Sequence, residues 1–158
     1  MTAFDRALRF VLGVEGEHSA PRPGDPHDTW YGLARTWNQD LPWPPTRAQA
    51  AARYRERYWD PIQGDLLPWP VSLVLFDAAV QHDPHDAIEF LQAALGVRVD
   101  GILGPATREA LRRRDIDAVV DEIIARRHVY YPTLATWPSN RLGWMRRMAA
   151  LHREAMRA

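Results

Sequence analysis

The stretch FDRALRFVLGVEGEH (residues 4–18) begins as an amphipathic helix and then meets an acid and a glycine. Its apolar residues fall at i, i+4, i+7 and i+8 counted from Phe4, which is the spacing of one helix face. The same spacing places Glu15 on that face, beside Leu12. Gly16 lets the chain turn away directly afterwards, so we expect the carboxyl group to face a cleft rather than a filled core.

A carboxyl group in this position is expected to keep its proton near neutral pH. Apolar neighbours disfavour its charged form, and the unpaired carbonyl groups at the end of the helix oppose an anion. Cleavage of a glycosidic bond needs such a proton donor, because the leaving sugar oxygen must be protonated as the bond breaks. The alternative, that Glu15 lies in solvent at a frayed helix end, stays open on spacing alone.

The rest of the chain predicts an all-α protein of six to eight helices. Residues 16–46 contain six prolines and are expected to be mostly loop. Capping signals and apolar spacing predict helices that begin near Thr46, Pro70, Asp83, Pro105, Asp115 and Ser139. No longer segment alternates with period 2, although VRVDGIL (residues 97–103) could form a small hairpin. The expected fold therefore leaves room for a small β-hairpin or an irregular loop region.

Composition narrows the classes of function. The chain has 158 residues, 20 basic and 20 acidic side chains and no cysteine, which rules out disulfides and Cys-ligated zinc. Zero net charge argues against a nucleic-acid binder, and no apolar run reaches the roughly 20 residues that span a bilayer. No signal peptide is visible, so we expect synthesis in the bacterial cytoplasm.

Several motifs, in order, resemble the glycoside hydrolase family 108 lysozymes, which are N-acetylmuramidases of phages and bacteria. The resemblance begins in FDRALRFVLGVEGEH and DPHDTWYGLARTW, and continues in RYWDPIQGDLLPWPVSLVLFDAAV. FLQAALGVRVDGILGPATREAL and GWMRRM are similar to the peptidoglycan-binding region that accompanies this family. The resemblance implies a lysozyme-like catalytic region at 1–82 and a helical peptidoglycan-binding-like region at 83–158, packed together as one compact unit. Residues 91–111 either bind the wall or only complete the core.

The same resemblance implies the site residues. Glu15 matches the catalytic glutamate, and Asp25 and Thr29 match the supporting positions of the loop that follows. His18, Trp30 and Tyr31 are assigned to substrate binding, because aromatic faces stack on sugar rings. Each has a plainer interpretation: Asp25 as a turn residue, Thr29 as a helix cap, and the aromatic side chains as core.

Two features depart from the family pattern and bear on the loop. Glu17 and His18 replace a glycine and an aromatic residue, and His27 and Asp28 replace a glycine pair. The group His18, Asp25, His27, Asp28 and the group His82, Asp83, His85, Asp86 could alternatively hold zinc, as in an amidase. Their spacing fits no established zinc motif, so we expect neither a metal nor a cofactor. Asp77 and Arg53, each among apolar helical residues, are expected to form an internal ion pair or polar contact.

These observations predict an endolysin-type hydrolase, active as a monomer on bacterial peptidoglycan after release by a separate system such as a holin. Glu15 would be the general acid in cleavage of the β-1,4 bond between N-acetylmuramic acid and N-acetylglucosamine. Two alternatives stay open: a lytic transglycosylase that uses the same glutamate, and a non-catalytic wall-binding module. Stable membrane insertion and nucleic-acid binding are not expected.

Overall fold

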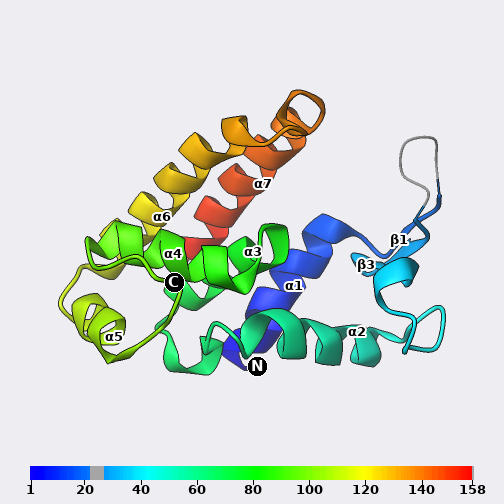
Figure 1. The fold of residues 1–158 in the computed structure, drawn as a ribbon. Helices are drawn as coiled ribbons and strands as arrows, with labels where there is room; N and C mark the ends of the chain where they lie inside the picture. Colours follow the sequence, from blue (N-terminus) through cyan, green and yellow to red (C-terminus); the bar gives the residue numbers. More distant parts are fainter. Residues whose placement is uncertain (22–26, 158) are drawn as a thin grey trace.

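The computed structural model describes residues 1–21 and 27–157, and this part of the chain contains seven α-helices and one small sheet (Figure 1). The helices are α1 (Ala3–Glu15), α2 (Arg47–Tyr54), α3 (Val71–Gln81), α4 (Pro84–Leu95), α5 (Pro105–Arg112), α6 (Ile116–Tyr130) and α7 (Trp137–Ala155). The strands are β1 (His18–Ser19), β2 (Thr29–Trp30) and β3 (Leu33–Ala34). Single helical turns are η1 (Arg35–Trp37), η2 (Arg55–Trp59), η3 (Gly64–Leu66) and η4 (Tyr131–Thr133). The predicted mostly α-helical, lysozyme-like fold is confirmed.

Helix α3 is the centre of the core. Every residue from Val71 to Ala79 is buried, as expected for a helix that is apolar on all sides. Helices α1, α4, α6 and α7 all pack against it, and Figure 1 shows α3 lying among them. Because elements from both halves of the chain share this helix, the core is continuous from α1 to α7.

The predicted helix ends are confirmed where a capping residue marks them. Thr46 and Gln49 form a capping box, and Asp83 accepts a hydrogen bond from the backbone N–H of Asp86 at the start of α4. Asp115 caps α6 in the same way, and Gly96 ends α4 in the left-handed conformation. Helix α7 begins at Trp137, two residues before the predicted start. None of the described helices combines the length and apolar character that crossing a bilayer requires.

The small hairpin predicted at 97–103 is wrong. This segment has no strand, because the side chain of Gln92 organises it as a turn: its Oε1 accepts from the backbone N–H groups of Asp100 and Gly101 at 2.8 and 2.9 Å. The sheet lies instead within the segment expected to be loop, with β2 antiparallel between β1 and β3. Strands of two residues are too short to produce a period-2 pattern in the sequence.

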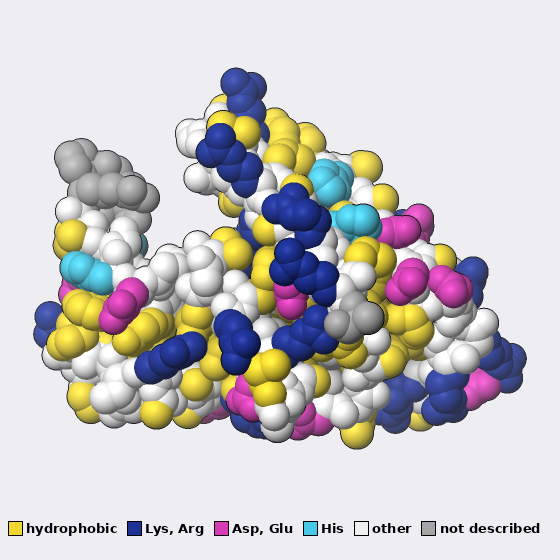
Figure 2. Space-filling model, turned by 180° about the vertical axis from the view of Figure 1, so that it is seen from behind, with side chains coloured by type: hydrophobic (Ala, Val, Ile, Leu, Met, Phe, Trp, Pro, Cys, Tyr) yellow, Lys and Arg dark blue, Asp and Glu magenta, His cyan; other side chains and the backbone are white. Residues whose placement is uncertain are grey.

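The small sheet and the end of the α6–α7 pair stand apart on the same side of the molecule. Figure 1 shows α1 ending between them, where the chain leaves for β1. The space-filling view shows a hollow between the lobe that contains the sheet and the projecting end of α6 and α7 (Figure 2). Glu15 is the last residue of α1, so it lies where the chain leaves this helix for β1.

His82, directly after α3, is a half-buried titratable group whose protonation should make stability depend on pH. Its ring packs against Phe90, Tyr130 and Tyr131, with centroid distances of 5.5, 5.2 and 5.2 Å. Its Nε2 atom is buried without a hydrogen-bond partner in the described chain. Burial, helped by the nearby positive charge of Arg127, lowers the pKa of His82 from 6.5 to about 4.

Between pH 6.5 and 4 the unfolded chain therefore binds a proton at His82 that the folded protein does not. The free energy of unfolding should fall over this range as the pH is lowered. We expect His82→Phe, which keeps an aromatic ring in the cluster, to remove this part of the slope. Urea unfolding of both proteins at pH 7.5, 6, 5 and 4 checks this, and parallel pH profiles would contradict it.

Candidate active site

Glu15 occupies the last position of α1, and its side chain is 25 % exposed. Gly16 follows with φ +80°, a left-handed conformation that glycine adopts without strain. One carboxylate oxygen, Oε1, accepts a hydrogen bond from Nη1 of Arg147 at 2.5 Å. The other, Oε2, has no hydrogen-bond partner in the described part of the chain. Glu15 thus has one oxygen fixed by protein and one oxygen available to a ligand.

Arg147 connects Glu15 to a buried network of alternating charges. Its Nε donates to Oδ1 of Asp77 at 2.7 Å, and Nη2 of Arg127 lies 2.9 Å from Oδ2 of the same carboxylate. Asp77 and Arg127 are completely buried, and Arg127 also donates to the hydroxyl of Tyr131 at 2.9 Å. The network contains two acids and two arginines, so their charges are equal in number and opposite in sign. Pairing of this kind allows a protein to keep charges in its interior. Helices α1, α3, α6 and α7 each supply one of them.

The network keeps the guanidinium of Arg147 charged. Burial alone would lower the pKa of Arg147, but the carboxylates of Asp77 and Glu15 outweigh it, and the pKa lies above its usual value. The cation beside Glu15 is therefore permanent. The sequence indicates apolar packing and a helix end around Glu15, and neither feature predicts this positive partner.

The turn between β2 and β3 forms the other wall around Glu15. Tyr54 donates its hydroxyl hydrogen to the backbone carbonyl of Tyr31 at 3.0 Å, which fixes the turn. Burial, followed by the charge of Glu15, raises the pKa of Tyr54, so this donor stays protonated. Gly32 follows with φ +75°, and a Cβ atom there would lie 3.0 Å from Cγ of Glu15 and would collide with the Tyr54 hydroxyl. Only a glycine allows this close approach.

Gly32→Ala should therefore disturb the site and the fold together. We expect a loss of about 1–2 kcal/mol in the free energy of unfolding from the left-handed backbone, and at least a tenfold lower rate of peptidoglycan cleavage, because the alanine methyl displaces Glu15. Gly13→Ala is the matched control: it lies in α1, and a Cβ there meets no atom within 4 Å. Urea unfolding and cleavage assays of both variants test this; equal behaviour would refute the role given to Gly32.

The other predicted site residues are distributed around the small sheet. Asp25 lies outside the described residues. Thr29 and Trp30 form β2, and no hydrogen bond joins Thr29 to Glu15 within the part of the chain that is described. His18 stacks on Trp30 with centroids 4.4 Å apart, so one face of this indole is already covered. Tyr31 donates to Oε1 of Glu17 at 3.2 Å.

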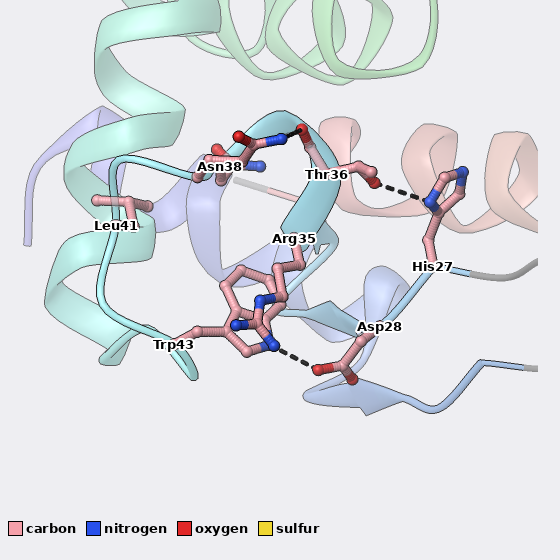
Figure 3. A pocket seen from close by; sticks show the side chains of 8 residues that line it. His27, Asp28, Arg35, Thr36, Asn38, Leu41 and Trp43 are labelled. Carbon is pink, nitrogen blue, oxygen red and sulfur yellow. Dashed lines mark hydrogen bonds between the residues drawn. The ribbon is translucent and has the colours of Figure 1, made fainter.

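A polar hollow of about 640 Å³ lies in the same lobe but does not include Glu15 (Figure 3). Asp28, on its edge, accepts from Nε1 of Trp43 at 2.5 Å and lies 3.0 Å from Nε2 of His18. The hydrogen bond with Trp43 lowers the pKa of Asp28 the most, and the hydrogen bond with His18 lowers it further. Nδ1 of His27 lies 2.7 Å from the hydroxyl of Thr36. Three side chains of the first zinc interpretation, those of His18, His27 and Asp28, are thus engaged with protein partners, and the fourth, Asp25, lies outside the described residues.

The second zinc interpretation brings three of its four residues together. Asp83, His85 and Asp86 offer ligand atoms within 4.8 Å of one another. The carboxylate of Asp83 already caps α4, however, and His82 packs among the aromatic rings described above. The cluster lies at the start of α4 and does not include Glu15, and we assign it no metal.

Arg147 and Arg127 are the residues that sequence reasoning missed. Helical spacing could have identified Arg147 as an inward-facing residue, because it shares the inner face of α7 with Trp144 and Leu151. The expected polar contact of Asp77 exists, but its partners are these two arginines. Arg53 pairs instead with Asp40 and Glu56.

Two family models match successive parts of the chain. Residues 8–82 match the family described as "Glycosyl hydrolase 108", and residues 86–149 match the family described as "Predicted Peptidoglycan domain". Among solved structures, SagA of Brucella abortus is 28% identical with a TM-score of 0.86, and the match covers 97% of this chain and 93% of that one. No curated protein matches significantly.

Proposed function

The chain belongs to glycoside hydrolase family 108 and carries a peptidoglycan-binding region, and we propose that it hydrolyses the β-1,4 bond between N-acetylmuramic acid and N-acetylglucosamine. The family is one of peptidoglycan hydrolases, so peptidoglycan is the polymer that the enzyme meets. The observation that supports the proposal is Glu15 itself, a partly exposed carboxyl group at the end of α1 with one oxygen held by Arg147 and the other available.

In this proposal Glu15 gives its proton from Oε2 to the glycosidic oxygen. The bond between that oxygen and the anomeric carbon breaks, and the hydroxyl of a water molecule adds to the carbon while the second water proton passes to a base. Arg147 orients the carboxyl group by holding Oε1 in place. A group that is already positioned loses little entropy when the substrate arrives.

The buried charges make this proton transfer compatible with an arginine next to the acid. Glu15 must be protonated before it can donate, and Arg147 would then lose one of its two carboxylate partners. Asp77 remains bound to Arg147 in that state, so the cation is not left unpaired. A bound glycan strand would also displace water from Glu15.

The remaining predicted residues receive supporting roles. We propose that Asp25 and Thr29 position the attacking water or stabilise positive charge at the anomeric carbon. Thr29 lies in the strand next to the turn that contacts Glu15, which supports this role. The uncovered parts of Trp30, and the ring of Tyr31, are proposed to contact sugar rings, with His18 supporting Trp30 from its other face.

Product analysis tests the proposed reaction. Purified peptidoglycan is digested, the new sugar ends are reduced with borohydride, and the fragments are identified by mass spectrometry. We expect reduced N-acetylmuramic acid ends. Reduced N-acetylglucosamine ends would identify the wrong bond, and 1,6-anhydro ends would show a lytic transglycosylase. Binding to the wall without release of soluble fragments would show that the protein is a non-catalytic wall-binding module.

A further inference from the structure

The outer face of α7 carries arginines that have no acidic partner. Arg146 and Arg153 are exposed and seven residues apart, so they lie on one side of the helix. Neither makes an ion pair with any residue in the described ranges. Arg157 lies two residues after the end of α7. It forms an ion pair with Glu154, and Arg6 of α1 pairs with the same acid. We refer to Arg6, Arg146, Arg153 and Arg157 as the α7 arginine stripe.

Arg146 and Arg153 differ from several other exposed arginines, which are neutralised by acids of their own helix. Arg112 and Arg113 pair with Glu109, and Arg126 pairs with Glu122. Helix α7 itself contains four arginines and one glutamate. A chain of zero net charge therefore concentrates positive charge on α7.

The opposite sign gathers on another surface. The groove between α4 and α6 has an apolar floor and is lined by Asp86, Glu89 and Glu122, with Arg126 as its basic residue. An anionic polymer would be repelled there and attracted to α7. The charge distribution therefore favours binding of an acidic ligand along α7 rather than in the groove between α4 and α6.

The stripe begins next to the proposed active site. Arg146 precedes Arg147, whose guanidinium contacts Glu15. Figure 2 shows dark-blue side chains in a row that descends from the projecting end of the α6–α7 pair, beside the hollow, along one ridge of the molecule. A strand cleaved at Glu15 would therefore pass near the start of the stripe, because Arg146 adjoins the arginine that holds Glu15.

We propose that the α7 arginine stripe binds the carboxylates of the peptide stems on the glycan strand that the enzyme cleaves. This inference rests on the proposed function. Peptide stems leave the strand at every muramic acid and carry free carboxylates, which guanidinium groups bind through paired hydrogen bonds. The adjacency to Glu15 favours stems of the bound strand over the phosphates of a separate wall polymer, which need not lie near the cleaved bond.

The expected effect is a preference for strands that carry stems. Exposed charge pairs are individually weak, so the whole stripe should give roughly a fivefold advantage in kcat/KM at low salt. The advantage should appear mainly in KM, because the stems bind away from the reacting atoms. It should shrink as the salt concentration rises.

The experiment compares two soluble substrates: glycan strands with their stems, and the same strands after an amidase has removed the stems. For the wild-type protein we expect a ratio of kcat/KM of about five between them. In Arg146→Gln/Arg153→Gln more than half of this preference should disappear. The matched control, Arg112→Gln/Arg113→Gln, changes two exposed arginines that are paired with Glu109 and should keep the wild-type ratio.

The outcomes separate the two proposals. A wild-type ratio of one, or a ratio that the α7 double variant leaves unchanged, overturns the role of the stripe while cleavage itself still supports the proposed function. Failure of the wild-type protein to cleave either strand overturns the proposed function. A loss seen only on walls that contain phosphate polymers would assign the stripe to phosphate and would also overturn the role proposed for the stems.

Discussion

Glu15→Gln is expected to lower the rate of peptidoglycan hydrolysis at least a hundredfold. Glutamine has the same shape, and its oxygen can still accept the hydrogen bond from Arg147, but its amide cannot give a proton to the leaving sugar oxygen. Loss of a general acid typically costs about 10²–10⁴ in rate. The release of soluble fragments from purified walls measures this effect.

The fold should tolerate the Glu15→Gln substitution. The side chain is partly exposed, and Arg147 retains Asp77 as its partner, so the melting temperature should change by only a few degrees. Glu17→Gln is the control, because Glu17 is an exposed acid two residues away whose contact is the hydroxyl of Tyr31. Activity of Glu15→Gln close to that of Glu17→Gln would remove Glu15 from its proposed role.

Asp77→Asn should have the largest effect on stability. Asp77 is the buried carboxylate between Arg127 and Arg147, and the amide would leave two buried cations with Glu15 as the one acid in the network. Removing one partner of a buried pair costs about 3–5 kcal/mol, which corresponds to a melting temperature roughly 10 °C lower for a chain of this size. Urea and thermal unfolding measure both quantities.

The same substitution should also slow hydrolysis at temperatures where the variant is folded. Without Asp77, Arg147 keeps only one of the two carboxylates that hold its guanidinium, so it positions Glu15 less firmly. Asp60→Asn is the control for stability, since Asp60 forms an exposed pair with Arg55 that should contribute less than about 1 kcal/mol. An Asp77→Asn protein as stable as Asp60→Asn would show that the buried network does not hold the helices together.

The sequence predicts those parts of the fold that depend on local chemistry. Helix ends marked by Thr46, Asp83 and Gly96 follow from side-chain and backbone hydrogen bonds within a few residues, and they are confirmed. The fully apolar helix α3 is likewise predicted by its composition. The three strands are not, because two residues give no alternation and their pairing is fixed by tertiary contacts.

The surroundings of Glu15 are likewise predicted from the sequence only where they depend on local chemistry. Its place on the inner face of α1 follows from helical spacing, and the turn at Gly16 follows from glycine. Its partner Arg147 lies 132 residues further along the chain, and no local pattern pairs the two. The α7 arginine stripe is hidden for a similar reason, because the sequence reports total charge and only the fold shows which arginines have acidic neighbours.

Hydrolysis at Glu15 is tested most directly by digestion of purified peptidoglycan in H₂¹⁸O. If water attacks the anomeric carbon, the wild-type protein will place one ¹⁸O atom on each new N-acetylmuramic acid end, and Glu15→Gln will produce almost no labelled ends. Soluble fragments without the label, or equal labelling by the Glu15→Gln variant, would contradict the account.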